Sequence, residues 1–251
     1  METRESKGGV VLSGRLQMLA DMVMPGNRLV DVGCDHGFLS IYLVRAGICP
    51  GAIAMDVREG PLAGAKRHVE AQGLGDYISL RLSDGLSAYG AGEADTLVCA
   101  GMGGRLMERI LRQGMEKAYG LQELILQPQS EIPQLRAFLR REGFLVTREE
   151  AVLEEGKYYF AMRARPGTKE PFSADADHDG GNNEFCLYDL YGEHLLKQRH
   201  PVLFSYLRQR RSYLERLGAS LEEAGSSRAG SRREEVREET ARIEAALAYY
   251  G

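Results

Sequence analysis

Several features that would place this chain in a common class of protein are missing from its 251 residues. No apolar run approaches the ~20 residues that a helix needs to cross a bilayer, so we expect no membrane span. The N-terminal stretch METRESKGGVVLSGRL is too polar and charged for a secretory signal, and a cytoplasmic protein is expected. The cysteines show neither a CxxC pair nor metal-ligand spacing. They are therefore expected to be reduced packing residues, with no metal site.

A strong basic charge is missing as well. The net charge of −4 counts mildly against a nucleic-acid partner, because such proteins usually carry a basic surface. The charge is unevenly distributed, however. Residues 166–184 hold one lysine against five acidic residues, whereas residues 185–211 hold five basic residues against two acidic ones. A local basic patch is therefore compatible with a globally acidic chain.

What is present is a hydrophobic content of 43%, enough for a core, and an alternation of strand and helix patterns up to residue 165. Short apolar runs rich in β-branched residues predict strands over 28–33, 52–57, 78–85, 94–104 and 123–129. Amphipathic stretches predict helices over 38–47, 60–73, 105–114 and 132–143. Residues 144–165 are typical of two strands joined by a turn. The pattern predicts an α/β fold, a doubly wound, mostly parallel Rossmann-like sheet with an antiparallel hairpin at its end.

The remainder of the chain has a different character. Residues 166–184 are rich in Gly, Pro, Asp and Ala and are expected to be a flexible acidic linker after a domain spanning 1–165. Within 185–251, leucines recur every seven residues from Leu207 to Leu221, and Val236 and Ile243 have the same spacing. Two such stripes predict an antiparallel, coiled-coil-like helical hairpin. It is either a plain appendage or a part that grips the substrate, and the chain is expected to be a monomer.

The stretch LVDVGCDHGFLS predicts a buried strand, a glycine turn and a helix. In dinucleotide folds such a turn is usually GxGxxG and binds pyrophosphate. Here Asp31 replaces the first glycine, His36 replaces the third, and Asp35 lies between them. These carboxylates would repel pyrophosphate but suit the sulfonium and ammonium groups of S-adenosylmethionine. We therefore expect a donor site that includes Asp31, Gly33, Cys34 and Gly37.

Acidic residues also end the next two predicted strands. Asp56 is placed to accept hydrogen bonds from ribose hydroxyls, and Asp84 from an adenine amino group. The alternative for Asp56 is a solvent-exposed acid at a strand end, and the alternative for Asp84 is an ordinary turn aspartate before glycine. The AGMGG stretch ends the fourth strand and leaves backbone exposed. It stands where many amino-group methyltransferases carry Asp/Asn-Pro-Pro-aromatic, so a plain exocyclic-amine mechanism is disfavoured. The expected donor site is completed by Asp56, Val57, Asp84, Gly85, Ala100, Gly101, Met102 and Gly103.

These motifs together resemble a known family. LSGRL, DVGCDHGFL, AIAMDVREGPLAGA, LSDGL, AGMGG, ILQPQ and KYYFAM occur in the order and approximate spacing of the bacterial tRNA adenine-N1 methyltransferases that act on position 22. The resemblance is close over residues 12–162 and looser beyond. Cys34 stands where the family usually has serine, Asp56 where it often has glutamate, and Gln129 where asparagine is more usual. The resemblance implies S-adenosylmethionine as the methyl donor, S-adenosylhomocysteine as its product, and tRNA as the acceptor, which residues 185–251 are expected to contact.

Adenine N1 attacks with its own lone pair and becomes cationic, so a carboxylate beside it would stabilise the transition state. Asp35 and His36 are the candidate catalytic residues, with helix-start or packing roles as their alternatives. Candidate substrate-binding residues are Arg15, Gly104, Arg105, Gln127, Gln129 and Tyr158. Two other functions remain open at this point: a methyltransferase for a small molecule or protein, and a non-catalytic binding module, which the intact Asp31, Asp56 and Asp84 disfavour.

Overall fold

The computed structural model describes residues 10–167, 185–223 and 227–251. The chain divides into two compact units, Met1–Ala176 and Asp177–Gly251, each described here by itself. Of the expected linker, only Pro166 and Gly167 belong to the described residues. Pro166 is the last residue of a strand, and the amide of Gly167 donates to the carbonyl of Gly143 (2.9 Å). The sheet therefore continues slightly further than the expected domain end.

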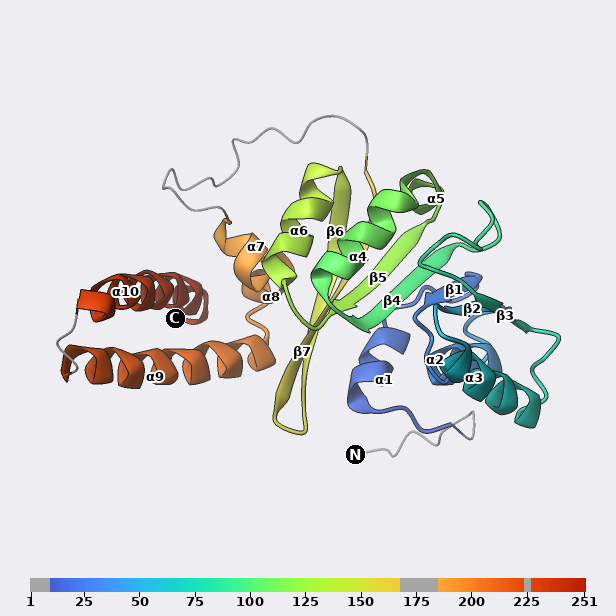
Figure 1. The fold of residues 1–251 in the computed structure, drawn as a ribbon, viewed down its shortest axis with the longest axis horizontal. Coiled ribbons are helices and arrows are strands. Elements are labelled where there is room, and N and C mark those ends of the chain that lie inside the picture. Colours follow the sequence, from blue (N-terminus) through green and yellow to red (C-terminus); the bar gives the residue numbers. More distant parts are fainter. Residues whose placement is uncertain (1–9, 168–184, 224–226) are drawn as a thin grey trace. The chain divides into compact units, whose positions relative to one another are not determined.

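The first unit is a seven-stranded sheet in the order β3-β2-β1-β4-β5-β7-β6 (Figure 1). The five strands in the run β3-β2-β1-β4-β5 are parallel to one another, whereas β7 is antiparallel both to β5 and to β6. The order reverses between β1 and β4, which is where ligands bind in sheets of this kind. The strands are β1 (Leu29–Val32), β2 (Ala52–Asp56), β3 (Ile78–Leu82), β4 (Thr96–Met102), β5 (Glu123–Pro128), β6 (Phe144–Glu154) and β7 (Lys157–Pro166). The predicted α/β sheet with a terminal antiparallel hairpin is confirmed.

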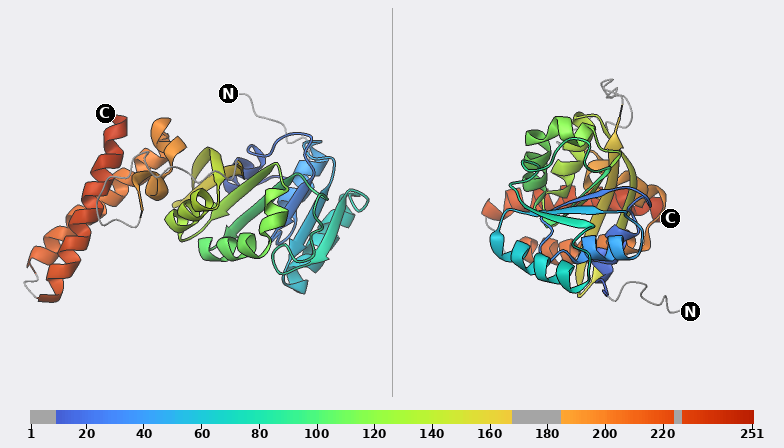
Figure 2. Two further views of the ribbon diagram at one scale, coloured as in Figure 1. Left: turned by 90° about the horizontal axis from the view of Figure 1, so that it is seen from above. Right: turned by 90° about the vertical axis from the view of Figure 1, so that its right-hand side faces the viewer.

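Helices cover both faces of this sheet, as Figure 2 shows. They are α1 (Gly14–Ala20), α2 (Phe38–Arg45), α3 (Glu59–Ala71), α4 (Gly104–Gln113), α5 (Met115–Tyr119) and α6 (Ile132–Arg141). The sequence patterns did not predict α1 or α5. Helix α1 is short, and its start is marked by Ser13, whose hydroxyl accepts from the amide of Leu16 (3.3 Å).

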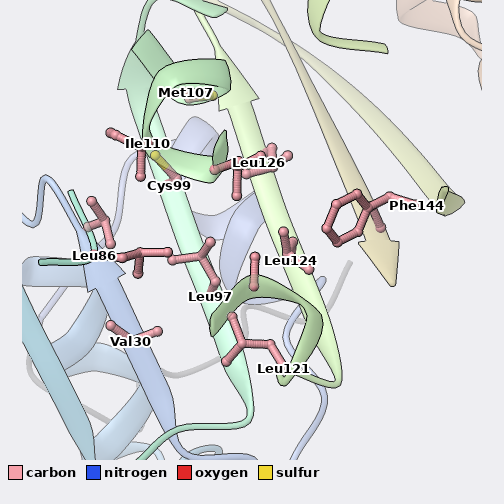
Figure 3. Packing of buried hydrophobic residues seen from close by; sticks show 14 of the residues in the cluster. Val30, Leu86, Leu97, Cys99, Met107, Ile110, Leu121, Leu124, Leu126 and Phe144 are labelled. Atoms are coloured by element: carbon pink, nitrogen blue, oxygen red, sulfur yellow. The ribbon is translucent and has the colours of Figure 1, made fainter. Parts of the chain in front are cut away.

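The two layers have separate cores, because successive strand residues point to opposite faces. In β1, Val30 and Val32 pack with α4, α5 and α6, whereas Leu29 packs with α1, α2 and α3. Figure 3 shows the first cluster, in which Met107 and Ile110 of α4 lie over Cys99, Leu97 and Leu126. Both clusters consist of apolar side chains, and the polar groups at the carboxyl ends of the strands lie above this packed base.

The second unit consists of α7 (Leu187–Tyr191), α8 (Glu193–Lys197), α9 (Pro201–Glu223), α10 (Ser227–Leu247) and a short 3₁₀ helix, Ala248–Tyr250. Helices α9 and α10 pack as the predicted antiparallel hairpin, since Arg210 pairs with Glu239 (2.6 Å) and Tyr250 reaches the carbonyl of His200 (3.0 Å). The heptad residues Leu207, Leu214 and Ile243 are buried between them. The two short helices before α9 were not predicted.

Gly104 allows the start of α4 to pack against the start of α6. A Cβ there would lie 2.6 Å from the carbonyl oxygen of Glu131 and 2.7 Å from that of Ser130, both backbone atoms that no rotamer change can move. We expect Gly104→Ala to lower the free energy of unfolding by ~1–3 kcal/mol. Gly60→Ala in α3 is the matched control, because nothing lies within 4 Å of that Cβ. It should be neutral or stabilising by ~0.5–1 kcal/mol. Urea unfolding measures both, and equal effects of the two substitutions would contradict the close-packing role.

Candidate functional site

A cavity of about 640 Å³ opens at the carboxyl ends of β1, β2 and β4. Its volume lies in the range of small-ligand sites. Most of the expected donor-site residues line it: Asp31, Gly33, Cys34, Asp56, Val57, Asp84, Gly85, Ala100, Gly101 and Met102. So do both candidate catalytic residues, Asp35 and His36, and two candidate substrate residues, Arg15 and Gln129. The other candidates, Gly37, Gly103, Gly104, Arg105, Gln127 and Tyr158, lie outside its lining. The assigned roles of all these residues stay predictions.

The turn after β1 is held in place by the neighbouring strand. The amides of Gly33 and Cys34 both donate to the carbonyl of Met55 in β2 (2.8 and 2.9 Å). Gly33 and Gly37 have φ of 76° and 74°, in the left-handed region that favours glycine. Gly37 ends the turn and caps α2, so its contribution is the backbone course rather than a cavity surface.

Asp31 is a buried carboxylate in the middle of an apolar strand. Its Oδ2 accepts a hydrogen bond from the hydroxyl of Ser40 on α2 (2.7 Å). Burial raises the pKa of Asp31 to about 6, the Ser40 hydrogen bond opposes this rise, and the charge of Asp56 adds to it. Burial and the charges of Asp31, Asp56 and Asp35 also raise the pKa of the Cys34 thiol, which is therefore neutral and unreactive.

Asp56 is the second buried carboxylate, and it organises the loops above it. Its Oδ1 accepts from the amide of Arg58 (2.9 Å) and its Oδ2 from the amide of Asp35 (3.3 Å). Asp35 itself has a left-handed φ of 50°, and its side chain is 65% exposed, 3.8 Å from Nε2 of His36. Asp84 lies in the open, 3.5 Å from Arg109 on α4. The cavity is therefore acidic at its base and carries two further carboxylates, those of Asp35 and Asp84, where it is open to solvent.

Two loops close the cavity over β4 and β5. The amide of Gln129 donates to the carbonyl of Met102, and the amide of Gly104 donates to that of Ser130 (both 2.9 Å). Gly101 has a φ of 74°, and a Cβ there would lie 3.4 Å from Nη1 of Arg15. Two glycines of AGMGG thus have different roles: Gly101 leaves room beside the cavity, whereas Gly104 permits close packing of the start of α4 against the start of α6.

The structure separates the candidate substrate residues. Arg105 is an exposed residue whose Nε is 4.0 Å from Glu131. Gln127 is completely buried, and its Oε1 accepts from Arg15 (2.9 Å). Of the two adjacent tyrosines, Tyr159 is the one whose ring lies under the Arg15 guanidinium, 5.7 Å from its centroid, whereas Tyr158 pairs across the hairpin with Leu153.

Sequence reasoning missed several residues at the cavity. Phe38 lines it although its ring is substantially exposed, and it stacks on His68 of α3 with ring centroids 4.8 Å apart. Leu106 lines it as well, while Ser40 supports Asp31 from below. The role of Ser40 could have been predicted from its position, because it lies on the inward face of the helix that immediately follows the acidic turn.

The geometry suits a ligand with a positively charged group. Burying the carboxylate of Asp31 costs free energy, which a cation or hydrogen-bond donor bound next to it would offset. Asp56 presents oxygens at the strand end where nucleosides bind in folds of this kind. Within the part of the chain that the structure describes, no three His, Cys, Asp or Glu side chains are grouped to hold a metal ion. The described helices also include none with the length and apolar character needed to cross a membrane.

Comparisons with known proteins agree with this picture. The family model of the methyltransferase domain matches residues 12–162. The tRNA (adenine(22)-N(1))-methyltransferase of Bacillus subtilis is 34% identical over 216 residues, which are 86% of this chain and 88% of the relative.

Two solved structures are similar over nearly the whole chain. One is a Streptococcus pneumoniae protein described as a candidate tRNA (m1A22) methyltransferase, in complex with S-adenosyl-L-methionine. It is 33% identical, has a TM-score of 0.79, and the match covers 94% of this chain and 100% of that one. The other is the Bacillus subtilis m1A22 tRNA methyltransferase TrmK, with 31% identity, a TM-score of 0.79 and coverage of 95% and 99%.

The fold, the acidic cavity and the domain match define the chain as a methyltransferase of the Rossmann type. Within that class, the chain belongs to the tRNA (adenine(22)-N(1))-methyltransferase family.

The raised pKa of Asp31 makes stability depend on pH. Because the folded pKa of about 6 exceeds the ordinary value of 3.8, the folded state binds the extra proton, and stability falls as pH rises through this window. A rise of that size corresponds to ~3 kcal/mol. We expect Asp31→Asn to be increasingly more stable than the wild type as pH goes from 4.5 to 7.5, measured by urea unfolding.

Ser40→Ala is the matched variant, because it removes the hydrogen bond that holds the pKa of Asp31 down. Its deficit in stability relative to the wild type should be larger at pH 7.5 than at pH 4.5. A difference between Asp31→Asn and wild type that does not change with pH would contradict the burial of a charged Asp31.

Proposed function

We propose that this protein transfers the methyl group of S-adenosylmethionine to N1 of adenine 22 in the D-arm of tRNA, leaving S-adenosylhomocysteine. The observation that carries the proposal is the acidic cavity at the β1–β4 reversal in a chain of the tRNA (adenine(22)-N(1))-methyltransferase family. S-adenosylmethionine supplies a methyl group made electrophilic by its sulfonium sulfur. The chain's own residues have to bind the two reactants, align them and meet the charge that develops.

The donor end of the cavity fits such a molecule. We infer that Asp31 faces its cationic methionine end and that Asp56 accepts from its ribose hydroxyls. Val57, exposed beside Asp56, offers an apolar surface to the adenine, and Asp84 lies beyond it. A pyrophosphate cofactor is disfavoured, because these same carboxylates would repel it.

The acceptor needs no base to remove a proton before attack, since adenine N1 has a free lone pair. The methylated ring is cationic, so a carboxylate close by lowers the barrier. Asp35 is suited to this role by its exposure at the cavity mouth, and His36 stands beside it. The rings of His36 and Phe38 at the same mouth can stack on an unpaired base.

Catalysis on a base in folded RNA requires that the base be unpaired or flipped, which costs a few kcal/mol. Contacts with the RNA away from the cavity have to offset that cost. We propose that the helical unit, residues 185–251, supplies them through its arginines. Arg208, in the first half of α9, has its guanidinium 5.7 Å from the ring of Phe204, and its positive charge is suited to a phosphate. A cytoplasmic, monomeric enzyme is part of the same proposal.

The decisive experiment compares two RNA transcripts, one with adenine and one with guanine at position 22. With labelled S-adenosylmethionine, we expect label only in the first, recovered as 1-methyladenosine after digestion and mass spectrometry. Equal label in both transcripts would refute the position, and label in a small molecule or protein but not in RNA would favour the alternative methyltransferase function.

Asp35→Asn tests the role of the exposed carboxylate. Asparagine tolerates the left-handed conformation at this position, so the backbone is expected to persist. We expect kcat to fall by ~10²–10⁴-fold, the range for loss of a group acting in the transition state, with little change in donor affinity. Asp76→Asn, at an exposed position before β3, is the control. A kcat equal to that of the control variant would exclude Asp35 from catalysis.

A further inference from the structure

Helix α1 is hydrogen-bonded to the β6–β7 hairpin at both of its ends. Arg148 of β6 donates to the carbonyl of Asp21 at the end of the helix (2.9 Å), and a carboxylate of β6 holds its start. Glu154, the last residue of β6, accepts hydrogen bonds from the backbone amides of Gly14 (2.5 Å) and Arg15 (3.4 Å). A Cβ at Gly14 would lie 3.1 Å from Oε1 of Glu154, so glycine lets the carboxylate approach. Ser13 satisfies a further first-turn amide, that of Leu16. The SGRL motif therefore docks the start of α1 on the hairpin.

The same docking places Arg15 at the cavity wall. Its Nη1 donates to Oε1 of Gln127, while its guanidinium lies over the ring of Tyr159. The amide of Gln127 is itself fixed, because its Nε2 donates to the carbonyl of Pro128 (3.1 Å). The guanidinium is thus held from two sides, beside the space that Gly101 leaves open.

Arg15 differs from the other two arginines of the cavity in its charge balance. Arg58 lies 3.7 Å from Asp56 and Arg109 lies 3.5 Å from Asp84. Across the described residues, by contrast, no carboxylate comes within 4.0 Å of the Arg15 guanidinium, which donates to a neutral amide. A partly buried cation without a counter-ion is a site for an anionic group.

We propose that Arg15 contacts an anionic group of a bound reactant and that Glu154 and Gln127 are positioning residues that hold it there. The inference rests on the proposed function, in which two reactants offer such a group. The donor has a carboxylate at its methionine end, and the RNA has a phosphate beside the target base. A guanidinium can bind either group. Whether the affinity for the donor or the affinity for tRNA depends on Arg15 decides which of the two it contacts.

The test uses Arg15→Ala, Glu154→Gln, the double variant, and Glu155→Gln as the matched control. Glu155 is the next residue at the hairpin tip, is exposed, and makes no hydrogen bond or ion pair with any described residue. Donor Kd is measured by calorimetry, and kcat and KM are measured with tRNA. A rise in donor Kd identifies the carboxylate as the partner, whereas a rise in KM for tRNA alone identifies the phosphate.

We expect Arg15→Ala to change one of these two constants by about tenfold or more, and Glu154→Gln to change the same constant by less. The double variant should be within about twofold of Arg15→Ala, because Glu154 acts through Arg15. Glu155→Gln should match the wild type. Effects of Arg15→Ala and Glu154→Gln that multiply, or that fall on different constants, would overturn the positioning role, as would an Arg15→Ala variant with both constants unchanged.

Gln127→Glu gives a second, independent measurement. It removes the Nε2 donor to Pro128 but keeps the acceptor oxygen and gives Arg15 a counter-ion, so the contact with Arg15 itself would be kept or strengthened. We expect the affinity that depends on Arg15 to fall instead, because the new carboxylate competes with the ligand's anion. Unchanged or improved affinity would overturn the proposal. If the wild type binds the donor but does not methylate tRNA, the proposed function fails, while the donor arm still tests the positioning of Arg15.

Discussion

The architecture of the cavity depends on the burial of one charge. Asp31 sits within an apolar strand, on the face that packs against α2, and its Oδ2 accepts a side-chain hydrogen bond from Ser40. Evolution of a stable fold alone would place an apolar residue there, since burying a carboxylate opposes folding. Such a carboxylate is expected at the base of a binding site, because the binding of a cationic ligand offsets the free energy that its burial costs. Two sets of backbone hydrogen bonds fix the loops around it. The amides of the turn after β1 donate to the carbonyl of Met55, and the amides of Asp35 and Arg58 donate to the carboxylate of Asp56.

Much of this arrangement could be predicted from the sequence. Strand and helix periodicities led to the sheet, and acids at the ends of successive strands led to the acidic end of the cavity, because parallel strands bring their carboxyl ends to one edge. The heptad spacing of Leu207 and Leu214 likewise led to the α9–α10 hairpin. These patterns are local in the sequence, and the general geometry of helices and parallel sheets determines the structure that they form. For that reason the structure can be predicted from them.

The part of the cavity around Arg15 was harder to predict, because it depends on contacts between distant segments. Nothing in the QPQ stretch indicates that Gln127 is completely buried and occupied with Arg15 more than a hundred residues earlier in the chain. Alternation along β7 correctly separates the two tyrosines onto opposite faces, but only the pairing of the hairpin with α1 shows that Tyr159 is the one beside Arg15. Helix α1 itself has too few residues to give a helical pattern, and side chains from distant β6, Glu154 and Arg148, hold its two ends.

The place of β7 in the sheet has a consequence for how the protein is made. Since β7 lies between β5 and β6, one edge of β5 has no partner until Lys157–Pro166 have been synthesised. The five parallel strands can assemble earlier, but they do so with an apolar, unpaired edge exposed. The ribosome therefore has to release almost the entire first unit before its sheet can close. If the ribosome paused after residue 143, the edge of β5 would stay unpaired and prone to aggregation until β7 is synthesised.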